Sequence, residues 1–397
     1  MYGHAMNDFA RDPVRADVIV VGGGFMGAAT AFFLRTHGLS VILLERDLIG
    51  QAASGTNFGN VRRQGRYLPQ LPLAHRSRDI WGRLPELIGE DVEFLPSGHL
   101  LVTTRSDDGA RLEQYAVDCK AWGLDLTMMT GDQARAMFPM VGPEIHTVSY
   151  SPHDGHANPR LAAPAFGRAA RRAGAHVVEQ APVLSITKDS TDFIAETADG
   201  RVYRAPMLQV SSGAWGRKMA ALFGEDVPMA PQGPQMGVTE PMPYRVAPVI
   251  GSASSVTDEG VYLRQVKRGN IVFGGGRRST ADLETKRARL DPMNTLRQMP
   301  QLARLLPAIA RLRVIRTWSG VEGYVQDSLP IMGPSERVSG LFYAFGFCGH
   351  GFQLGPGVGA TMAELIATGH TDIPLEPFRV GRFQRNAANA AAYSPHA

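Results

Sequence analysis

The alternation of apolar and polar positions predicts a strand, a helix and a second strand near the start of the chain. Residues 17–21 form a short apolar run that is typical of a buried strand, and a helical pattern extends from the following glycines to about residue 37. A second apolar run covers residues 40–44 and ends in Glu45. This order predicts a β-α-β unit, the building block of parallel sheets.

Glycines occupy the turn between the first strand and the helix, where residues 22–27 read Gly-Gly-Gly-Phe-Met-Gly. In a dinucleotide-binding unit the first glycine makes a tight turn, the second lets the backbone approach a pyrophosphate, and the third lets helix and strand pack closely. Gly22, Gly24 and Gly27 stand at these positions. Glu45, at the end of the second strand, is placed to accept hydrogen bonds from ribose hydroxyls. We therefore predict a bound dinucleotide.

Two later segments repeat the order of strand, glycine turn and helix. The first has a strand at 207–210, a turn at 211–216 and a helix at 217–223. The second has a strand at 341–345, a glycine-rich loop at 346–359 and a helix at 360–368. A simple nicotinamide-binding domain needs only one such unit. The repeats therefore indicate that the chain returns to its first sheet to complete a longer cofactor site.

The composition indicates a globular enzyme with many defined turns. Of the 397 residues 44% are hydrophobic and 20% charged, which excludes a disordered chain, although there are 44 glycines and 27 prolines. Cys119 and Cys348 are the two cysteines; they cannot form a disulfide framework and show no zinc-ligand spacing, so we expect no metal site and a cytoplasmic location. No apolar run has the length of a transmembrane helix, and the first sixteen residues lack a signal-peptide core.

The net charge of +4 is too small for a general nucleic-acid binder, but the arginines are unevenly placed. Residues 48–78, which we call the first arginine stretch, contain no acidic residue and hold Arg62, Arg63, Arg66, Arg76 and Arg78. Residues 292–321, the second arginine stretch, contain no acidic residue and hold Arg297, Arg304, Arg311, Arg313 and Arg316. Each stretch is interpreted either as a solvated basic face or as a source of positive potential that draws an anionic ligand into a cleft.

An ordered set of motifs extends over nearly the whole chain. It comprises residues 20–27, Glu45-Arg46, Ala53-Ser54-Gly55-Thr56-Asn57, Asp154-Gly155 with Pro159, Ser212-Gly213-Ala214-Trp215, Val238-Thr239-Glu240-Pro241, the DSLPIMG run at 327–333, and Gly349-His350-Gly351-Phe352. With these motifs the sequence resembles the FAD-dependent family that includes D-amino-acid oxidase, glycine oxidase and monomeric sarcosine oxidase. The resemblance covers residues 17 to about 383.

The resemblance implies an α/β fold with two interleaved domains. The first is a Rossmann-type, glutathione-reductase-like FAD-binding domain built from residues 16–90, 150–225 and 328–383. The second is a smaller α+β substrate-binding domain with an antiparallel sheet, built from residues 91–149 and 226–327. We expect residues 1–15 and 386–397 to be flexible termini.

The resemblance also implies which residues bind FAD. Gly22, Gly24, Phe25, Met26 and Gly27 would lie at the pyrophosphate, Glu45 at the adenosine ribose, Arg46, Ser54 and Asn57 along the cofactor, Val183 at the adenine, Gly213 and Trp215 beside the phosphates, Arg62 against the flavin, and Gly349, His350, Gly351, Phe352 and Gln353 over the flavin pyrimidine. The helix that follows residue 349 would present amide N–H groups where a reduced flavin gathers negative charge.

Two positions depart from the family pattern. Gly320 stands where sarcosine oxidases have the cysteine that bonds the flavin, so we predict non-covalent FAD. Glu322 stands where glycine oxidase has an arginine that clamps the substrate carboxylate. Glu322 would repel a carboxylate and attract a second ammonium or a guanidinium, or it would pair with Arg316 or another core arginine. Gln353 replaces the lysine of sarcosine oxidases, which removes a further charge.

Other cations must then hold the carboxylate of an amino-acid substrate. The candidates for the substrate pocket are Arg62, Arg66, Tyr262, Arg264, Trp318, Glu322 and His350, with Arg63 and Arg316 as further cations. For each of these arginines an ion pair elsewhere in the fold is the alternative, and for Trp318 the alternative is a packed core aromatic. No residue is assigned as a catalytic acid or base, because the flavin carries the chemistry.

The function implied by the resemblance is FAD-dependent oxidation of the C–N bond of an amino acid or secondary amine. A hydride would pass to flavin N5, and the resulting imine would be hydrolysed. The alternative is an FAD-bearing subunit of a hetero-oligomeric dehydrogenase that passes electrons to a partner subunit or a quinone instead of oxygen. A nicotinamide dehydrogenase is the third hypothesis. We expect a small-molecule substrate and no nucleic acid; a partner subunit or a homo-oligomer stays open.

Overall fold

The structure, a computed structural model, describes residues 12–385 and confirms the β-α-β unit at the start of the chain. Strand β2 (Val18–Val21), helix α1 (Phe25–Thr36) and strand β3 (Val41–Leu44) follow one another as the apolar pattern predicts. β2 and β3 pair in parallel, and every residue of both strands is buried. A strand covered on both faces must be apolar throughout, which explains these uninterrupted runs.

A six-stranded sheet surrounds β2 and draws its strands from distant parts of the chain. Its order is β23-β24-β13-β2-β3-β9, formed by Ile331–Pro334, Leu341–Phe345, Met207–Val210, Val18–Val21, Val41–Leu44 and His176–Val178. All neighbours pair in parallel except β23, which is antiparallel to β24. The expected return of the chain to its first sheet is confirmed, because β13 and β24 extend the sheet that β2 begins.

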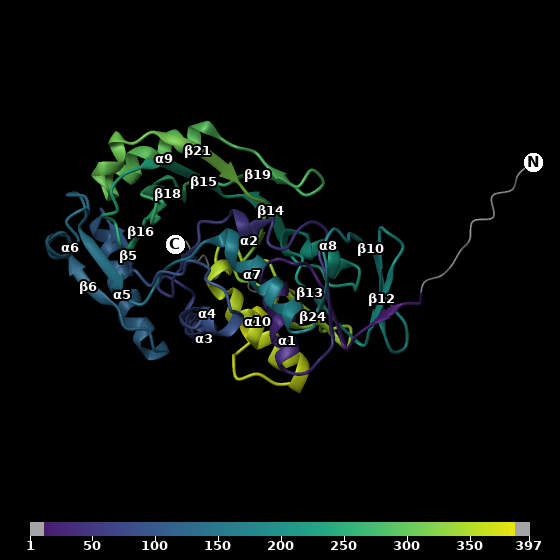
Figure 1. Ribbon diagram of the computed structural model, residues 1–397. Helices are drawn as coiled ribbons and strands as arrows, with labels where there is room; N and C mark the ends of the chain where they lie inside the picture. The colour runs from purple at the N-terminus through teal and green to yellow at the C-terminus, as the bar shows by residue number, and fades with distance from the viewer. Residues whose placement is uncertain (1–11, 386–397) are drawn as a thin grey trace, which may run out of the picture.

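Helix α1 lies between α7 (Pro159–Arg172) and α10 (Gly351–Thr368), as the teal and yellow ribbons beside the purple one show (Figure 1). Helix α10 begins at Gly351, so most of the loop predicted for residues 346–359 is helical. Its glycines permit close packing: a Cβ at Gly355 would lie 2.5 Å from the Phe25 ring, and one at Gly359 would overlap Ala29. The loop itself is confined to residues 346–350.

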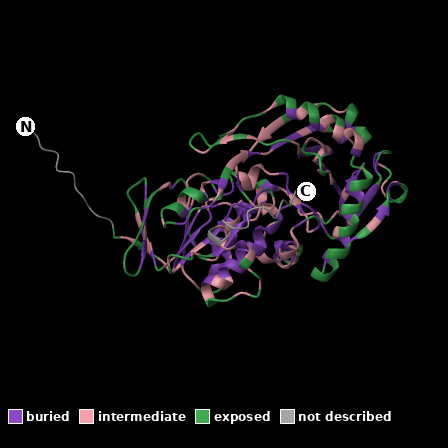
Figure 2. Cartoon of the chain, turned by 180° about the vertical axis from the view of Figure 1, so that it is seen from behind, coloured by how far each residue is buried: buried purple, intermediate pink, exposed green. Residues whose placement is uncertain are grey.

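An eight-stranded sheet forms the second large layer. Its order is β21-β15-β18-β17-β16-β5-β7-β6, formed by Val314–Ser319, Gln235–Pro241, Asn270–Gly275, Val261–Gln265, Val249–Ser252, His99–Thr103, Thr147–Ser151 and Thr127–Thr130. Neighbouring strands are antiparallel, as expected, except that β16 and β5 are parallel. Helix α9 (Pro292–Leu305) packs on this sheet and turns its outer face to solvent (Figure 2).

Three smaller sheets complete the β-structure. Their orders are β1-β12-β11-β10 (Val14–Arg15, Val202–Ala205, Phe193–Thr197, Val183–Lys188), β20-β19-β14-β22 (Arg287–Ala288, Ser279–Asp282, Met229–Gly233, Glu322–Val325) and β4-β8 (Asn60–Val61, Gly155–His156). The pairing of β1 with β12 differs from the expectation of a flexible segment 1–15, because Val14 and Arg15 add to an existing sheet edge. Residues 1–11 and 386–397, also expected to be flexible, lie outside the described residues.

The remaining helices lie at the ends and sides of these sheets. They are α2 (Ala53–Thr56), α3 (Leu71–Gly82), α4 (Leu84–Ile88), α5 (Ser106–Asp118), α6 (Gly131–Met137), α8 (Gly216–Ala221) and α11 (Arg382–Arg385). The turn predicted at 211–216 contains a single 3-10 turn, Gly213–Trp215, that leads into α8. Between residues 12 and 385 no helix is long and apolar enough to cross a membrane.

Candidate active site

A large cavity lies where the parallel strands of the six-stranded sheet end. Its volume is about 1420 Å³. One part of its wall comes from the ends of β2, β3 and β10 and includes Gly22, Glu45 and Val183, and another part comes from β17 and β22 and includes Tyr262 and Glu322. Ligands of open α/β sheets bind at the carboxyl ends of the strands, which is where this cavity opens.

The glycine turns border this cavity with bare backbone. Gly22 has a φ of +106°, and a Cβ there would lie 2.5 Å from the carbonyl oxygen of Ser211, so the turn requires glycine. A Cβ at Gly24 would meet only the Ser54 Oγ, at 3.2 Å, and one at Gly213 would meet no atom within 4 Å. Gly27 does not line the cavity; its Cβ would overlap the Gly22 carbonyl oxygen. The turns thus fit a phosphate-bearing cofactor, with Gly27 serving helix packing.

Glu45 holds the glycine turn in place. Its Oε2 accepts a hydrogen bond from the N–H of Gly23 at 2.6 Å, and its Oε1 accepts one from the N–H of Asp47 at 2.7 Å. Burial raises the pKa of this carboxyl group. Beside it, the Arg46 guanidinium lies 4.2 Å from the ring centre of Trp215, and both residues line the cavity. Glu45, which is predicted to bind the ribose, therefore also supports the loop that would hold the phosphates.

Ser54 and Asn57 bring α2 to the same part of the cavity. The Ser54 Oγ accepts a hydrogen bond from the N–H of Phe25 at 2.8 Å and so caps an orphan donor at the start of α1. The Asn57 side chain donates to the carbonyl oxygen of Ser54 at 2.8 Å. Phe25 and Met26 line the cavity as well.

The loop at residues 346–350, which we call the flavin loop, and the first turn of α10 form another part of the wall. Residues 349–353 all line the cavity, and the first turn of α10 carries no acidic side chain. The N-terminus of this long helix therefore contributes positive potential. Gln353 is not placed as a charged residue that binds a substrate would be. Its amide nitrogen donates to the carbonyl oxygen of Ala74 at 2.8 Å and is buried against α3.

Arg62 and Arg66 bring two guanidinium groups to the cavity. Arg66 donates to the carbonyl oxygen of Arg62 at 3.0 Å, to the Gln70 Oε1 at 3.0 Å and to the carbonyl oxygen of His350 at 3.4 Å. Arg62 donates to the carbonyl oxygen of Gln64. Burial lowers the pKa of both side chains, that of Arg66 to about 9 with the charge of Arg62 as a second cause. The ion pairs among residues 12–385 include neither arginine, so an anionic ligand would complete this part of the site.

Tyr262 and Glu322 stand on strands β17 and β22 and also line the cavity. The Tyr262 ring packs against Phe58 with ring centres 4.6 Å apart, and burial and the charge of Glu322 raise its pKa to about 12. Glu322 accepts hydrogen bonds from the N–H of Gly349 at 2.6 Å and from the Tyr324 hydroxyl at 3.1 Å. The pairing of Glu322 with Arg316 that we considered is not formed, because Arg316 lies exposed on β21.

Comparison with known proteins identifies the family. The family model described as FAD dependent oxidoreductase (DAO) matches residues 17–365. The chain belongs to the FAD-dependent oxidoreductase family. FAD is therefore the cofactor that the glycine turns and the flavin loop would hold. The α/β fold agrees with that of solved family members.

Relatives of this FAD-dependent oxidoreductase match it over nearly their full length. It is 28% identical over 377 residues to glycine oxidase of Geobacillus kaustophilus (strain HTA426), covering 93% of this chain and 97% of that protein. It is 26% identical over 378 residues to sarcosine oxidase subunit beta of Arthrobacter sp, covering 93% and 91%. The crystal structure of L-proline dehydrogenase from P. horikoshii aligns with a TM-score of 0.87 at 26% identity, covering 94% of this chain and 99% of that chain.

Four of the residues expected in or near the substrate pocket lie outside the cavity. Arg264 is buried beneath Phe58, to whose carbonyl oxygen it donates at 2.7 Å, and its Nη1 lies 3.2 Å from the His156 Nδ1. Trp318 donates its indole N–H to the carbonyl oxygen of Thr56 at 2.8 Å, which agrees with the core alternative. Arg63 pairs with buried Asp154 at 2.9 Å, and Arg316 faces solvent.

Three residues of the cavity wall escaped the sequence reasoning. The Tyr115 hydroxyl accepts a hydrogen bond from the N–H of Arg66 at 3.0 Å, and the Arg278 guanidinium lies 4.0 Å from the ring centre of Tyr324. Tyr115 stands in amphipathic α5, where a tyrosine is typical of the core. Arg278 is the second residue of an Arg-Arg pair that follows a glycine run, a pattern equally typical of a surface loop. Only the fold brings these residues to the cavity.

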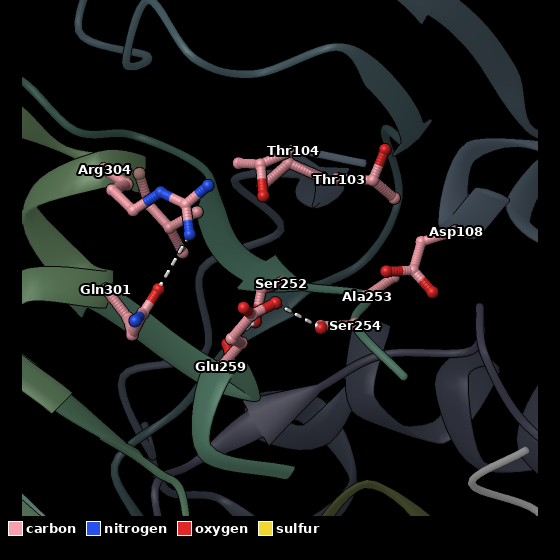
Figure 3. A pocket seen from close by; sticks show the side chains of 11 residues that line it. Thr103, Thr104, Asp108, Ser252, Ala253, Ser254, Glu259, Gln301 and Arg304 are labelled. Atoms are coloured by element: carbon pink, nitrogen blue, oxygen red, sulfur yellow. Dashed lines mark hydrogen bonds between the residues drawn. The ribbon is translucent and has the colours of Figure 1, made fainter. Parts of the chain in front are cut away.

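A second cavity, of about 10 Å³, lies between the loop after β16 and the helices α5 and α9 (Figure 3). Ser254 donates to Glu259 at 2.7 Å and Arg304 donates to Gln301 at 3.1 Å in its wall, and the Thr103 Oγ1 has no partner. This volume holds about one water molecule. The second cavity therefore has room for a structural water and not for a substrate.

Proposed function

We propose that this protein oxidises the C–N bond of an amino acid or a secondary amine with FAD held non-covalently in the large cavity. The observation that carries the proposal is that Arg62 and Arg66 reach the same cavity as the glycine turns and form no ion pair in the described part of the chain, because Asp154, whose charge acts on both, pairs with Arg63. A carboxylate is the complementary group, because a guanidinium fork matches its two oxygens.

The residues that hold the cofactor would be the bare turns and the flavin loop. Gly22, Gly24 and Gly213 would lie at the phosphates, Glu45 and Val183 at the adenosine, and residues 349–352 at the other end of the molecule. When bound, FAD supplies the acceptor for two electrons from the C–N bond.

The chain's own contribution would be orientation and positive charge. Arg62 and Arg66 would bind the substrate carboxylate, and Tyr262, whose pKa of about 12 keeps it protonated at neutral pH, would donate a hydrogen bond. The start of α10 and Arg62 would favour negative charge that develops beside them. Holding the substrate in one orientation in a cavity of apolar and backbone groups removes much of the entropic barrier.

Two positions support non-covalent binding of FAD, because neither offers a reactive side chain that could bond to the flavin. Gly320 has no side chain, and the Cys348 Sγ accepts from the N–H of Val325 at 3.2 Å while burial raises the pKa of its thiol to about 12. A protonated thiol is a poor nucleophile. Precipitation of the holoenzyme with trichloroacetic acid should leave the flavin in the supernatant; yellow colour in the pellet would contradict this proposal.

The proposed reaction is tested by its products. Holoenzyme should be incubated in air with D- and L-amino acids, N-methylated amino acids and N-carboxyalkylated amino acids. We expect at least one of them to yield a carbonyl product, together with ammonia or a dealkylated amine. If every amine is recovered unchanged when air and an artificial quinone acceptor are supplied, the proposed function is wrong.

The second candidate function is that of an FAD-bearing subunit in a hetero-oligomeric dehydrogenase. It is favoured by the relative named sarcosine oxidase subunit beta and by the exposed arginines of the second arginine stretch. After anaerobic reduction, exposure to air distinguishes the two. Fast reoxidation with formation of peroxide supports an oxidase, and slow reoxidation that a quinone accelerates supports the subunit.

We also propose the two-domain division that the resemblance implies. The eight-stranded sheet supports it, because its strands come from residues 99–151 and 235–319 and so fall almost entirely within the proposed substrate-binding segments 91–149 and 226–327. Strand β7 (Thr147–Ser151) crosses the proposed boundary at residue 149. Limited proteolysis of the apoprotein should cut first between the two domains, near residues 91, 226 or 327, because residue 149 is buried inside β7.

A further inference from the structure

Glu322 is a carboxylate in the cavity wall that has hydrogen bonds but forms no ion pair with the described residues, and Arg278 acts on it only as a neighbouring charge. One oxygen accepts from the N–H of Gly349 and the other accepts from the Tyr324 hydroxyl. Neither donor carries a positive charge. None of the ion pairs in the part of the chain that the structure describes involves Glu322. A carboxylate that is withdrawn from water without a cation is destabilised, so its charge calls for a cation from the ligand.

Arg278 does not form an ion pair with Glu322, although its charge acts on the carboxylate. Arg278 stacks on the ring of Tyr324, with 4.0 Å between its guanidinium carbon and the ring centre, and it donates to the Gln232 side chain at 3.4 Å. It affects the pKa of Glu322 less than burial and the two hydrogen bonds do. Both residues line the cavity, but Arg278 is largely exposed and its guanidinium is engaged by Tyr324 and Gln232. The remaining lone pairs of the Glu322 carboxylate are therefore available to accept hydrogen bonds from a ligand inside the cavity.

The cavity thus carries opposite charges at two places. Arg62, Arg66 and Glu322 all line the cavity, and the charges of Arg62 and Glu322 both act on the hydroxyl of Tyr262. A substrate that places its carboxylate against the arginines can extend a cationic group past Tyr262 to Glu322. Like-charged groups in either place would be repelled, so the two sites together select a dipolar ligand.

The cation at Glu322 is not the nitrogen that is oxidised. An ion pair with a carboxylate stabilises the ammonium form and raises the pKa of the amine. Oxidation of the C–N bond needs the neutral amine with its lone pair. A carboxylate bound to the reacting nitrogen would therefore oppose the reaction, whereas a carboxylate bound to a second cation would orient the substrate without this cost.

We propose that the substrate carries, in addition to the nitrogen of the C–N bond that is oxidised, a second cationic group, an ammonium or a guanidinium, and that this group binds to Glu322. The inference rests on the proposed function. It narrows the substrate class to basic amino acids and their N-alkylated derivatives, with the carboxylate at Arg62 and Arg66.

Two pairs of ligands that differ only in the distal charge test this. Arginine and citrulline have side chains of nearly the same size, but citrulline is neutral; lysine and norleucine form the second pair. Both enantiomers of each should be bound to the holoenzyme in anaerobic equilibrium dialysis. We expect the wild-type protein to bind the cationic member of at least one pair more than about tenfold tighter, as expected for a charge-assisted contact.

Two variants identify Glu322 as the cause. In E322Q the amide oxygen can still accept from the N–H of Gly349, so the flavin loop keeps its contact while the charge is lost. We expect the preference to fall below about twofold. In Y324F the charge stays and one hydrogen bond is lost, so the preference should persist. The flavin absorbance of each variant gives its FAD content.

Three results would overturn the inference. They are equal binding of the charged and neutral members by the wild-type protein, no binding of either member of both pairs, and an unchanged preference in E322Q. The wild-type comparison decides even if E322Q does not fold. Failure of the proposed function gives a different result: arginine or lysine binds with a preference that depends on Glu322, but the flavin stays oxidised.

Discussion

The first and second arginine stretches each hold five arginines and no acidic residue, but the fold gives them different surroundings. In the first stretch, Arg62 and Arg66 lie in the wall of the large cavity, and Arg63 pairs with fully buried Asp154. In the second stretch, Arg304 pairs with exposed Glu144 on the outside of α9, and Arg316 faces solvent on the edge strand β21.

The difference teaches that a local excess of arginine does not by itself indicate a binding site. The first stretch follows the glycine turns and leads into α3, which packs against α10, so its side chains are enclosed. The second stretch covers the amphipathic helix α9, whose outer face is exposed (Figure 2), and the edge strand β21. The second stretch is thus largely a solvated face, whereas the first brings Arg62 and Arg66 to a cavity, where attraction of an anionic ligand stays a prediction.

The largest effect should follow removal of Arg63. The variant R63M leaves Asp154 buried without a cation, which costs about 3–5 kcal/mol in the free energy of unfolding. Urea unfolding followed by tryptophan fluorescence measures this loss. R304M removes the corresponding ion pair of the second stretch, and we expect it to change the same quantity by less than about 1 kcal/mol. Equal losses in the two variants would break the comparison.

The next largest effect should appear in R62M, as a loss of activity. Without one of the two guanidinium groups in the cavity, kcat/KM for the best amine substrate should fall about 100-fold, or about 2.7 kcal/mol. R311M, in the second stretch, is the matched control and should stay within about twofold of the wild type. If R62M retained wild-type kcat/KM, Arg62 would not bind substrate or support the flavin.

A smaller effect should appear as sensitivity to acid. Burial and the charge of Arg62 lower the pKa of His99 to about 3, so His99 stays neutral in the folded state while it is protonated below about pH 6.5 in the unfolded chain. The unfolded state then binds more protons, and stability falls as the pH drops from 6.5 towards 3, by about 2 kcal/mol at pH 5.

The measurement is the urea-unfolding free energy at pH 8 and at pH 5. In the H99Q variant the difference between these values should shrink by about 2 kcal/mol. H370Q, which removes an exposed histidine, is the control variant and should leave the difference close to that of the wild type. An equal acid dependence in wild type and H99Q would show that burial and Arg62 do not hold His99 neutral in the folded protein.

The smallest effect should follow changes to the exposed arginines. The double variant R311M/R316M removes two charges from the second stretch, and we expect changes below about 0.5 kcal/mol in stability and below about twofold in kcat/KM. Steady-state kinetics at low and high salt provide the measurement. A large fall in kcat/KM at low salt alone would mean that this stretch steers the substrate and would weaken the comparison.

Much of the fold could be predicted because it depends on local patterns. The runs that become β2, β3, β13 and β24 are short, apolar and bounded by glycine, and they read as buried strands from the sequence alone. The start of α10 could not be predicted. Glycines that permit a turn and glycines that permit close helix packing look alike in one sequence, and only contact with Phe25 and Ala29 distinguishes them.

The site was predicted less completely, because position along a strand does not show where a cavity ends. Tyr262 and Arg264 are two residues apart and share one face of β17, but the second lies about 7 Å further along. Tyr262 lines the cavity, whereas Phe58 and His156 cover Arg264. In the same way Arg62 and Arg63 are neighbours, but only Arg62 reaches the cavity.

The central claim is that the cavity lined by Arg62, Arg66 and the flavin loop oxidises amines. Its most direct test is anaerobic mixing of the yellow holoenzyme with amino acids and secondary amines, basic ones included, while the flavin absorbance near 450 nm is recorded, roughly the range where oxidised flavins absorb. We predict that at least one amine bleaches the flavin in a single turnover and that R62M slows this bleaching strongly. A flavin that dithionite reduces but no amine does would contradict the account.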